Sequence, residues 1–213
     1  MSRGVAEMQS IAVQRVQKPA PLMVEDQARA DWYGLLAALW QAPARESLLR
    51  DLRNAPVDPG TELGLAFGGL VEACRQFDAD SIRQEFDTVF LGVGRPEVFL
   101  QASFYLTGFL HERPLADLRE ILAQAGLARS EAQSFTEDHM GVLCEVMRLL
   151  VQDGGEQQSN LEFQQQVFGS YIGPSFEALC DALERSESAQ FYKALAPVAR
   201  AFFAIERQAF DFV

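Results

Sequence analysis

The chain contains few of the side chains that build disulfides and metal centres: it has three cysteines and two histidines in 213 residues. Cys74, Cys144 and Cys180 are far apart and show no C-x-x-C spacing, so neither a disulfide framework nor a zinc site is expected. Each lies in an apolar run, which predicts buried, reduced thiols and is typical of a reducing cytoplasm. A chain of this length buries about 70% of its unfolded surface, so it can fold without such links.

Basic charge and long apolar runs are also scarce. Lys and Arg number 18 against 30 Asp and Glu, which gives a formal net charge of −12. Nucleic-acid binders need a basic surface to neutralise phosphates, so no nucleic-acid partner is expected, whereas an acidic surface attracts cationic ligands and peptides. The sequence has no run of 18 apolar residues, and its first 21 residues lack the apolar core of an export signal. We therefore expect a cytoplasmic protein without stable membrane insertion.

Alternating strand patterns and hairpin signals are absent, and apolar residues recur at three- and four-residue spacing from Asp26 onward. This pattern predicts an all-α fold, with a mobile N-terminal tail at residues 1–25 and a single helical domain at 26–213. Pro197 should kink the last helix, and glycines 64, 68 and 69 favour the close approach of another helix. About nine or ten short helices are expected, at residues 26–42, 45–53, 61–77, 81–91, 104–110, 114–125, 136–152, 160–171, 174–185 and 188–212.

The long connections at residues 92–103 and 152–160 are candidate hinges. Copies of a chain with many short helices can exchange an element through such hinges. A monomer and a domain-swapped dimer are therefore both compatible with the sequence.

Motifs of metal sites and nucleotide sites are incomplete. His111-Glu112 begins like the zinc motif H-E-x-x-H, but Leu115 stands at the fifth position. Residues 92–95, Gly-Val-Gly-Arg, lack the G-K-[ST] ending of a phosphate loop and follow a helix instead of a strand. No metal and no cofactor are expected from these patterns.

The stretch FTEDHMGVLCEVM, residues 135–147, places an acid beside one of the two histidines at a predicted helix start. In a structural interpretation Thr136 caps the helix, the two acids after it favour the positive helix end, and His139 lies at the core margin. In a second interpretation Asp138 and His139 form the edge of a ligand-binding groove. In a third, the protein is a small helical hydrolase or nucleotide-using enzyme built on Asp138, His139 and Arg95. Periodicity does not separate these interpretations.

Three segments, read together, carry a family resemblance: FDTVFLG (86–92), QASFYLTGFLHERPLADLREILAQAGL (101–127) and TEDHMGVLCEVMRLL (136–150). In this order and spacing they resemble the TorD/DmsD/NarJ family of redox-enzyme maturation chaperones, in particular its TorD/DmsD branch. The resemblance implies a TorD-like, all-helical cytoplasmic protein that is not an enzyme. Its partner would be the apo form of a molybdopterin oxidoreductase. The chaperone would bind the twin-arginine signal peptide of that enzyme and hold it for cofactor insertion before export.

The resemblance also implies a site for the signal peptide. The family's aromatic-x-x-Leu-Phe segment falls on Phe86, Val89 and Phe90. Its Asp-His pair falls on Asp138 and His139. Because arginine binds carboxylates through strong, geometrically specific hydrogen bonds, an apolar groove with an acidic rim would suit such a peptide. The peptide-binding residues expected on this basis are Phe86, Asp87, Val89, Phe90, Glu137, Asp138, His139 and Leu143.

Overall fold

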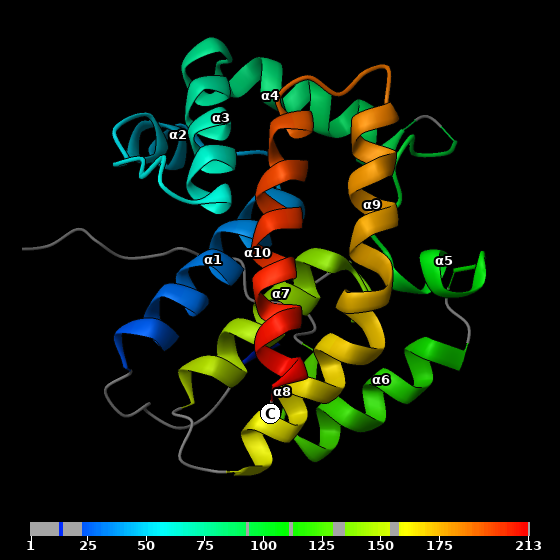
Figure 1. Ribbon diagram of the computed structural model, residues 1–213. Helices are drawn as coiled ribbons and strands as arrows, with labels where there is room; N and C mark the ends of the chain where they lie inside the picture. The colour runs from blue at the N-terminus through cyan, green and yellow to red at the C-terminus, as the bar shows by residue number, and fades with distance from the viewer. Residues whose placement is uncertain are drawn as a thin grey trace, which may run out of the picture.

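The computed structural model describes residues 13–14, 23–92, 94–110, 113–129, 135–153 and 158–212. Most of the expected N-terminal tail, and the His111-Glu112 pair, lie outside the described residues. The described part folds almost entirely into short helices in one bundle, so the predicted all-α fold is confirmed (Figure 1). The helices are α1 (Val24–Gln41), α2 (Glu46–Arg53), α3 (Glu62–Gln76), α4 (Ala79–Phe86), α5 (Ala102–Thr107), α6 (Arg113–Gln124), α7 (Met140–Gln152), α8 (Gln158–Val167), α9 (Gly173–Arg185) and α10 (Leu195–Asp211).

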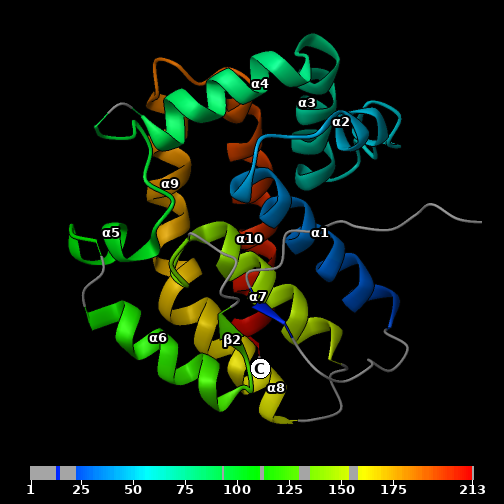
Figure 2. The ribbon, with the colours of Figure 1, turned by 180° about the vertical axis from the view of Figure 1, so that it is seen from behind.

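A short antiparallel strand pair is the exception to the helical fold. Strand β1 (Val13–Gln14) pairs with β2 (Ala128–Arg129) next to α7 (Figure 2). Strands of two residues are too short to show apolar alternation, so the sequence pattern does not reveal them. A single backbone bridge also joins Gln101 to His139.

Helices α1 and α7 lie side by side at the centre of the bundle and make its most extensive helix–helix contact (Figure 2). Gly141 in the first turn of α7 permits this approach. A Cβ atom there would lie 2.8 Å from Cγ of Gln41 and 3.2 Å from Cβ of Trp40. The side-chain amide of Gln41 also donates to the carbonyl of Gly141 at 2.8 Å. This contact fixes where both ends of α7 lie.

Helix α10 packs against α3 and α9 and carries much of the aromatic core (Figure 1). The ring centroid of Phe202 lies 4.8 Å from that of Tyr33 on α1. The neighbouring ring of Phe203 lies 5.4 Å from that of Phe176 on α9. All four side chains are buried, so these contacts join three helices in one hydrophobic core.

A buried ion pair ties α1 to α10. The carboxylate of Glu206 accepts hydrogen bonds of 2.8 Å from Nε and Nη2 of Arg29 and from the hydroxyl of Tyr33. Nη2 of Arg29 also donates to Gln164 of α8 at 3.1 Å. Burial by itself would lower the pKa of Arg29, but the hydrogen bonds and charge of Glu206 outweigh it and raise that pKa. Both charges of the pair are thereby compensated, which a buried ion pair requires.

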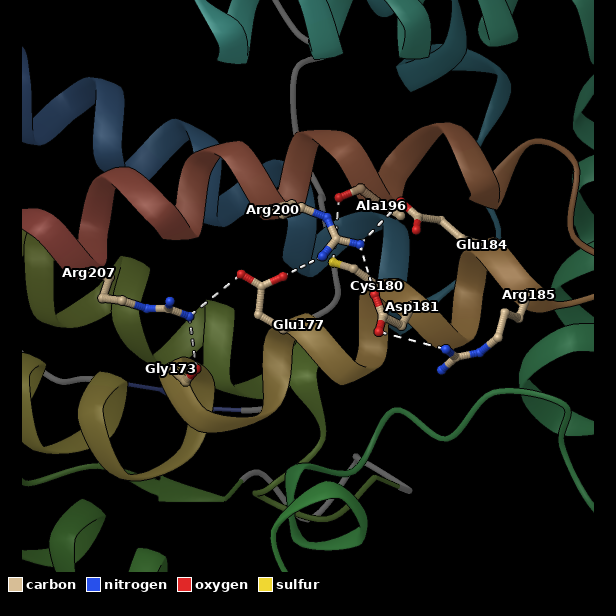
Figure 3. Close-up of polar contacts among 9 residues, drawn as sticks. All are labelled: Gly173, Glu177, Cys180, Asp181, Glu184, Arg185, Ala196, Arg200 and Arg207. Carbon is tan, nitrogen blue, oxygen red and sulfur yellow. Dashed lines mark hydrogen bonds and ion pairs between the residues drawn. The ribbon is translucent and has the colours of Figure 1, made fainter.

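A more exposed ionic network joins α9 to α10 (Figure 3). Arg200 of α10 lies between three carboxylates of α9, and its Nη2 atom is 3.2 Å from oxygens of both Asp181 and Glu184. Glu177 accepts a hydrogen bond from Arg200 and lies 3.8 Å from Nη2 of Arg207. Partly exposed pairs of this kind contribute at most about 1 kcal/mol each, so the network orients the two helices more than it stabilises them.

All three cysteines are buried and unpaired, as predicted. Burial raises the pKa of Cys74 to about 11 and that of Cys180 to about 12, and it also raises the pKa of Cys144. The thiols therefore stay protonated and poorly reactive near neutral pH.

Two local predictions are wrong. Pro197 is the third residue of α10, where a missing N–H leaves no helix hydrogen bond unmade, so it does not kink the helix from inside. Two glycines of α3, Gly64 and Gly68, face a loop instead of another helix, and a Cβ on Gly69 would meet no atom within 4 Å. A Cβ on Gly64 would lie 1.7 Å from the carbonyl oxygen of Asp58, and one on Gly68 would lie 3.1 Å from Cγ1 of Val57.

Candidate functional site

The turn before α7 differs from the predicted helix start. The backbone N–H of His139 donates to the carbonyl of Thr136 at 3.1 Å, and α7 begins only at Met140. His139 is the N-cap, because its Nδ1 accepts a hydrogen bond from the N–H of Gly141 at 3.2 Å. The hydroxyl of Thr136 is buried and has no hydrogen-bond partner within the described chain. The predicted Thr136 cap is therefore wrong.

Asp138 is fully buried and serves the start of a different helix, α5. Its backbone carbonyl accepts from the N–H of Ala102 at 2.8 Å. Its Oδ2 accepts from the hydroxyl of Ser103 at 2.5 Å and from the N–H of the same residue at 3.3 Å. The first N–H groups of a helix have no partner inside it, so Asp138 supplies the acceptors that α5 needs.

Glu137 also turns inward, and Arg119 of α6 binds its carboxylate with two hydrogen bonds, Nε to Oε1 at 3.0 Å and Nη2 to Oε2 at 3.1 Å. These hydrogen bonds raise the pKa of Arg119. Glu137, Asp138 and His139 thus tie together the starts of α5 and α7 and the middle of α6. We call these three residues, with Ser103 and Arg119, the junction.

The environment of His139 keeps its imidazole neutral near pH 7. The ring stacks on Phe135, with centroids 4.3 Å apart, and is 2% exposed. Burial lowers the pKa of His139 to about 4, against the opposing effect of the Asp138 charge. A general base needs a ring nitrogen that can reach the substrate and a pKa near the operating pH, and the buried His139 has neither. Arg95 lies over the ring of Phe99 at 5.3 Å, and within the described residues no hydrogen bond or ion pair joins it to the Asp-His pair.

The predicted aromatic part of the site lies at the end of α4 and in the π-helical turn Asp87–Leu91 that follows it. Phe86 and Phe90 contact each other at 5.1 Å and Tyr192 at 5.8 and 4.9 Å, between ring centroids. Val89 is fully buried beside them. Asp87 points to solvent and is the exposed member of this group.

One extended segment joins the aromatic part to the junction. The N–H of Val98 donates to the carbonyl of Val89 at 3.0 Å, and two residues later the carbonyl of Leu100 accepts from Met140 at 2.6 Å. Leu143, on α7, is fully buried. Seven of the eight predicted peptide-binding residues are therefore buried, and Asp87 alone of the eight is exposed.

A separate groove of about 600 Å³ lies between α1, α2 and the C-terminal half of α7. Small or apolar residues form much of its lining, including Gly34 and Ala38 of α1 and Leu48 of α2. The small side chains of α1 leave this space open. We call it the α1–α2–α7 groove. The groove was not predicted from the sequence, although Gly34, Ala37 and Ala38 in the run GLLAALWQAPA (34–44) are a signal of small side chains along α1.

Charged side chains border the α1–α2–α7 groove. The carboxylates of Asp31 and Asp51 are exposed on α1 and α2. Glu145 of α7 is nearly buried and accepts from Nε and Nη2 of Arg148 at 2.8 and 2.5 Å. Nη1 of Arg148 donates to Gln152 at 2.8 Å. The groove therefore combines an apolar floor with carboxylates at the edge.

The comparison with known families decides the assignment. Residues 58–202, more than half of the chain, match the family described as nitrate reductase delta subunit. The chain belongs to this family. The nitrate reductase delta subunit family is a family of redox-enzyme maturation chaperones, which implies a molybdoenzyme partner. No curated protein matches the sequence.

The family match covers the junction completely and the α1–α2–α7 groove only in part. The junction lies entirely within residues 58–202, and so do Glu145, Arg148 and Gln152 of the groove. Helices α1 and α2, which form the other walls of the groove, precede the matched residues. In this member of the nitrate reductase delta subunit family, the groove is thus built in large part from residues beyond the match.

No three His, Cys, Asp or Glu side chains in the described part of the chain come together to hold a metal ion. None of the described helices is both long and apolar enough to cross a membrane.

Proposed function

We propose that the protein is a cytoplasmic chaperone of the TorD/DmsD branch. It binds the twin-arginine signal peptide and the apo form of a molybdopterin oxidoreductase, and it holds this client for cofactor insertion before export. The family match over residues 58–202 carries the proposal. The net charge of −12 supports it, because an acidic protein attracts a cationic leader over long range.

The predicted binding residues enter this proposal in two ways. Asp87 is exposed and can contact a leader directly. Among the buried members, Asp138 and His139 cap α5 and α7. Their role in this proposal is to hold the helices in place, and direct contact with the leader would require their capping hydrogen bonds to open.

The test is a titration of the purified full-length chain with synthetic twin-arginine leader peptides of molybdopterin oxidoreductases. Apo-enzyme with and without its leader is tested in parallel by co-purification. The wild-type chain should bind the peptide and retain the leader-bearing apo-enzyme. Absence of binding to any leader and to any apo-enzyme would contradict the proposed function.

Three variants then separate contact from positioning at the junction. Asp138→Ala and Ser103→Ala remove the same internal hydrogen bond from opposite sides. If Asp138 touches the leader, Asp138→Ala should weaken binding more than Ser103→Ala does, and equal losses would mean that the bond acts through the fold. Unchanged affinity in both Asp138→Ala and His139→Ala would remove the pair from the site.

A further inference from the structure

The α1–α2–α7 groove has the size and lining of a binding site for a short chain segment. Its volume of about 600 Å³ lies within the range of roughly 300–1,000 Å³ found for ligand sites. Gly34 and Ala38 are half-buried, so apolar surface on the floor remains accessible to an occupant. A segment with apolar side chains would gain most from burial there.

The charges at the groove edge favour a cationic occupant. Three carboxylates, Asp31, Asp51 and Glu145, face two guanidinium groups, those of Arg45 and Arg148. Glu145 is neutralised by Arg148, so the two aspartates of the rim outnumber the one remaining guanidinium group, that of Arg45, and the groove edge keeps a net negative charge. Both lie on the exposed surface of a chain with a net charge of −12.

The two aspartates are free to accept new donors. In the described chain, the carboxylate of Asp51 makes no hydrogen bond or ion pair, and that of Asp31 accepts only from the side-chain amide of Gln27, at 2.7 Å. The hydrogen bonds of Glu145 raise the pKa of Arg148, and the charge of Asp31 adds to this rise. Asp31 therefore already acts on one guanidinium group at this groove.

We propose that the α1–α2–α7 groove is where the client's leader docks, with its apolar residues on the floor and its arginines on Asp31 and Asp51. This inference rests on the proposed function and states where on the protein the leader binds. Arginine suits this role better than lysine because its planar fork binds a carboxylate through two hydrogen bonds.

The first experiment is a double-mutant cycle on the full-length chain. The probes are the synthetic leader peptide and the same peptide with both arginines replaced by glutamine. The variant Asp31→Asn/Asp51→Asn should bind the arginine peptide about tenfold more weakly than the wild type and the glutamine peptide almost equally well. Asp80→Asn, the same change at an exposed site on α4, should alter neither affinity.

The second experiment fills the floor of the α1–α2–α7 groove with a large side chain. Ala38→Trp places a large ring in the groove, whereas Ala116→Trp places it on the exposed face of α6, away from the groove (Figure 2). The first variant should lose at least tenfold in affinity for the leader peptide, and the second should bind as the wild type does. Circular dichroism and thermal unfolding check that both variants are folded.

A fluorescent label provides a readout that does not depend on affinity. Because the three native cysteines are buried, Ser47→Cys introduces an accessible thiol at the groove edge, and Ala116→Cys introduces one at the control position. An environment-sensitive dye at position 47 should respond to the leader peptide, and the same dye at position 116 should not.

The outcomes distinguish this inference from the proposed function. If the wild type binds the leader but the charge and floor variants bind equally well, the leader docks elsewhere and the inference is overturned while the function stands. If Ala38→Trp changes the oligomeric state and leaves peptide affinity unchanged, the groove is a contact between copies, which also overturns it. If no leader or apo-enzyme binds the wild type, both proposals fail together.

Discussion

Acidic residues lie beside both ends of α7, in the preceding turn at one end and on α1 and α2 at the other, and their environments are opposite. At its N-terminal end, Glu137 and Asp138 are buried, and their carboxylates are bonded to Arg119 and Ser103. Along its C-terminal half runs the α1–α2–α7 groove, where the rim carboxylates remain exposed. The same type of side chain therefore builds the fold at one end of the helix and leaves a surface free for a partner at the other.

The physical reason for this difference is desolvation. A buried carboxylate loses its hydration and recovers the loss only through internal hydrogen bonds, which Glu137 makes with both oxygens and Asp138 with Oδ2, while Oδ1 of Asp138 has no partner among the described residues. An exposed carboxylate keeps its water and can exchange it for an incoming guanidinium at low cost. A family motif that falls on buried residues thus marks how the helices are held together, and the neighbouring open surface is the better place to look for direct contact.

The largest effect should come from breaking the junction. Asp138→Ala leaves the hydroxyl and the backbone N–H of Ser103 without their side-chain acceptor. We expect the free energy of unfolding, measured in urea, to fall by about 2–3 kcal/mol. Asp87→Ala, an exposed acid nearby in the predicted set, should change it by less than about 0.5 kcal/mol. Equal effects would mean that the burial of Asp138 carries no energetic weight.

The second prediction concerns pH and His139. Its pKa is about 4 in the folded protein against an ordinary value of 6.5, so the unfolded chain takes up the proton first as pH falls. The stabilisation that the neutral, buried imidazole gives to the folded state is complete above pH 6.5 and is lost as pH falls towards 4. Between pH 7 and pH 5 this loss lowers the free energy of unfolding by about 2 kcal/mol.

The matched variant for this prediction is His139→Asn, which keeps a side chain able to cap α7 but cannot take up a proton. Urea unfolding of both proteins at several pH values separates the effect of the histidine on stability from that of the carboxylates, because the carboxylates titrate in both proteins. The difference between them should shrink as pH falls from 7 to 5. A constant difference would show that the imidazole is not sequestered.

A third, smaller effect tests the helix contact that connects the two regions. Gly141→Ala would press a methyl group against Gln41 and Trp40, and we expect a loss of about 1–2 kcal/mol in unfolding free energy. Gly69→Ala on α3 meets no atom within 4 Å and should gain about 0.5–1 kcal/mol from helix propensity. Thermal unfolding of the two variants measures both changes in stability. A stabilised Gly141→Ala protein would argue against the close α1–α7 approach.

The smallest effect on stability is expected at the groove rim. Asp31→Asn and Asp51→Asn should each change the unfolding free energy by less than about 0.5 kcal/mol, because both side chains are exposed. Urea denaturation checks this directly beside Asp138→Ala. A loss as large as that of Asp138→Ala would remove the contrast between structural and free carboxylates.

Most helices were predicted from the sequence, and the errors occur where several neighbouring residues can begin or cap a helix. The stripe at Ala28, Trp32 and Leu36 placed α1 within two residues of its observed start at Val24. The start of α7 was placed four residues early, because Thr136 and His139 can both cap a helix. The extended segment around Leu100, which bonds to Met140, selects between them, and no local pattern contains that contact.

The candidate site was less accessible from the sequence than the fold. Helical spacing does not tell a buried edge of a helix from an exposed one. Phe86 and Phe90 could line either a groove or the core, and Tyr192, more than 100 residues later, encloses them in the core. The groove depends on how α1 and α2 diverge beside α7, which is a property of packing.

By itself, the sequence determined the all-α class, the reduced cysteines, the acidic field and the resemblance to maturation chaperones. These follow from periodicity, composition and ordered motifs, which are local or additive along the chain. Only the tertiary structure decided which acids lose their water and which keep it. Glu137 and Asp138 are enclosed by α5 and α6, whereas Asp31 and Asp51 border an open groove, because burial depends on residues brought together from distant parts of the chain.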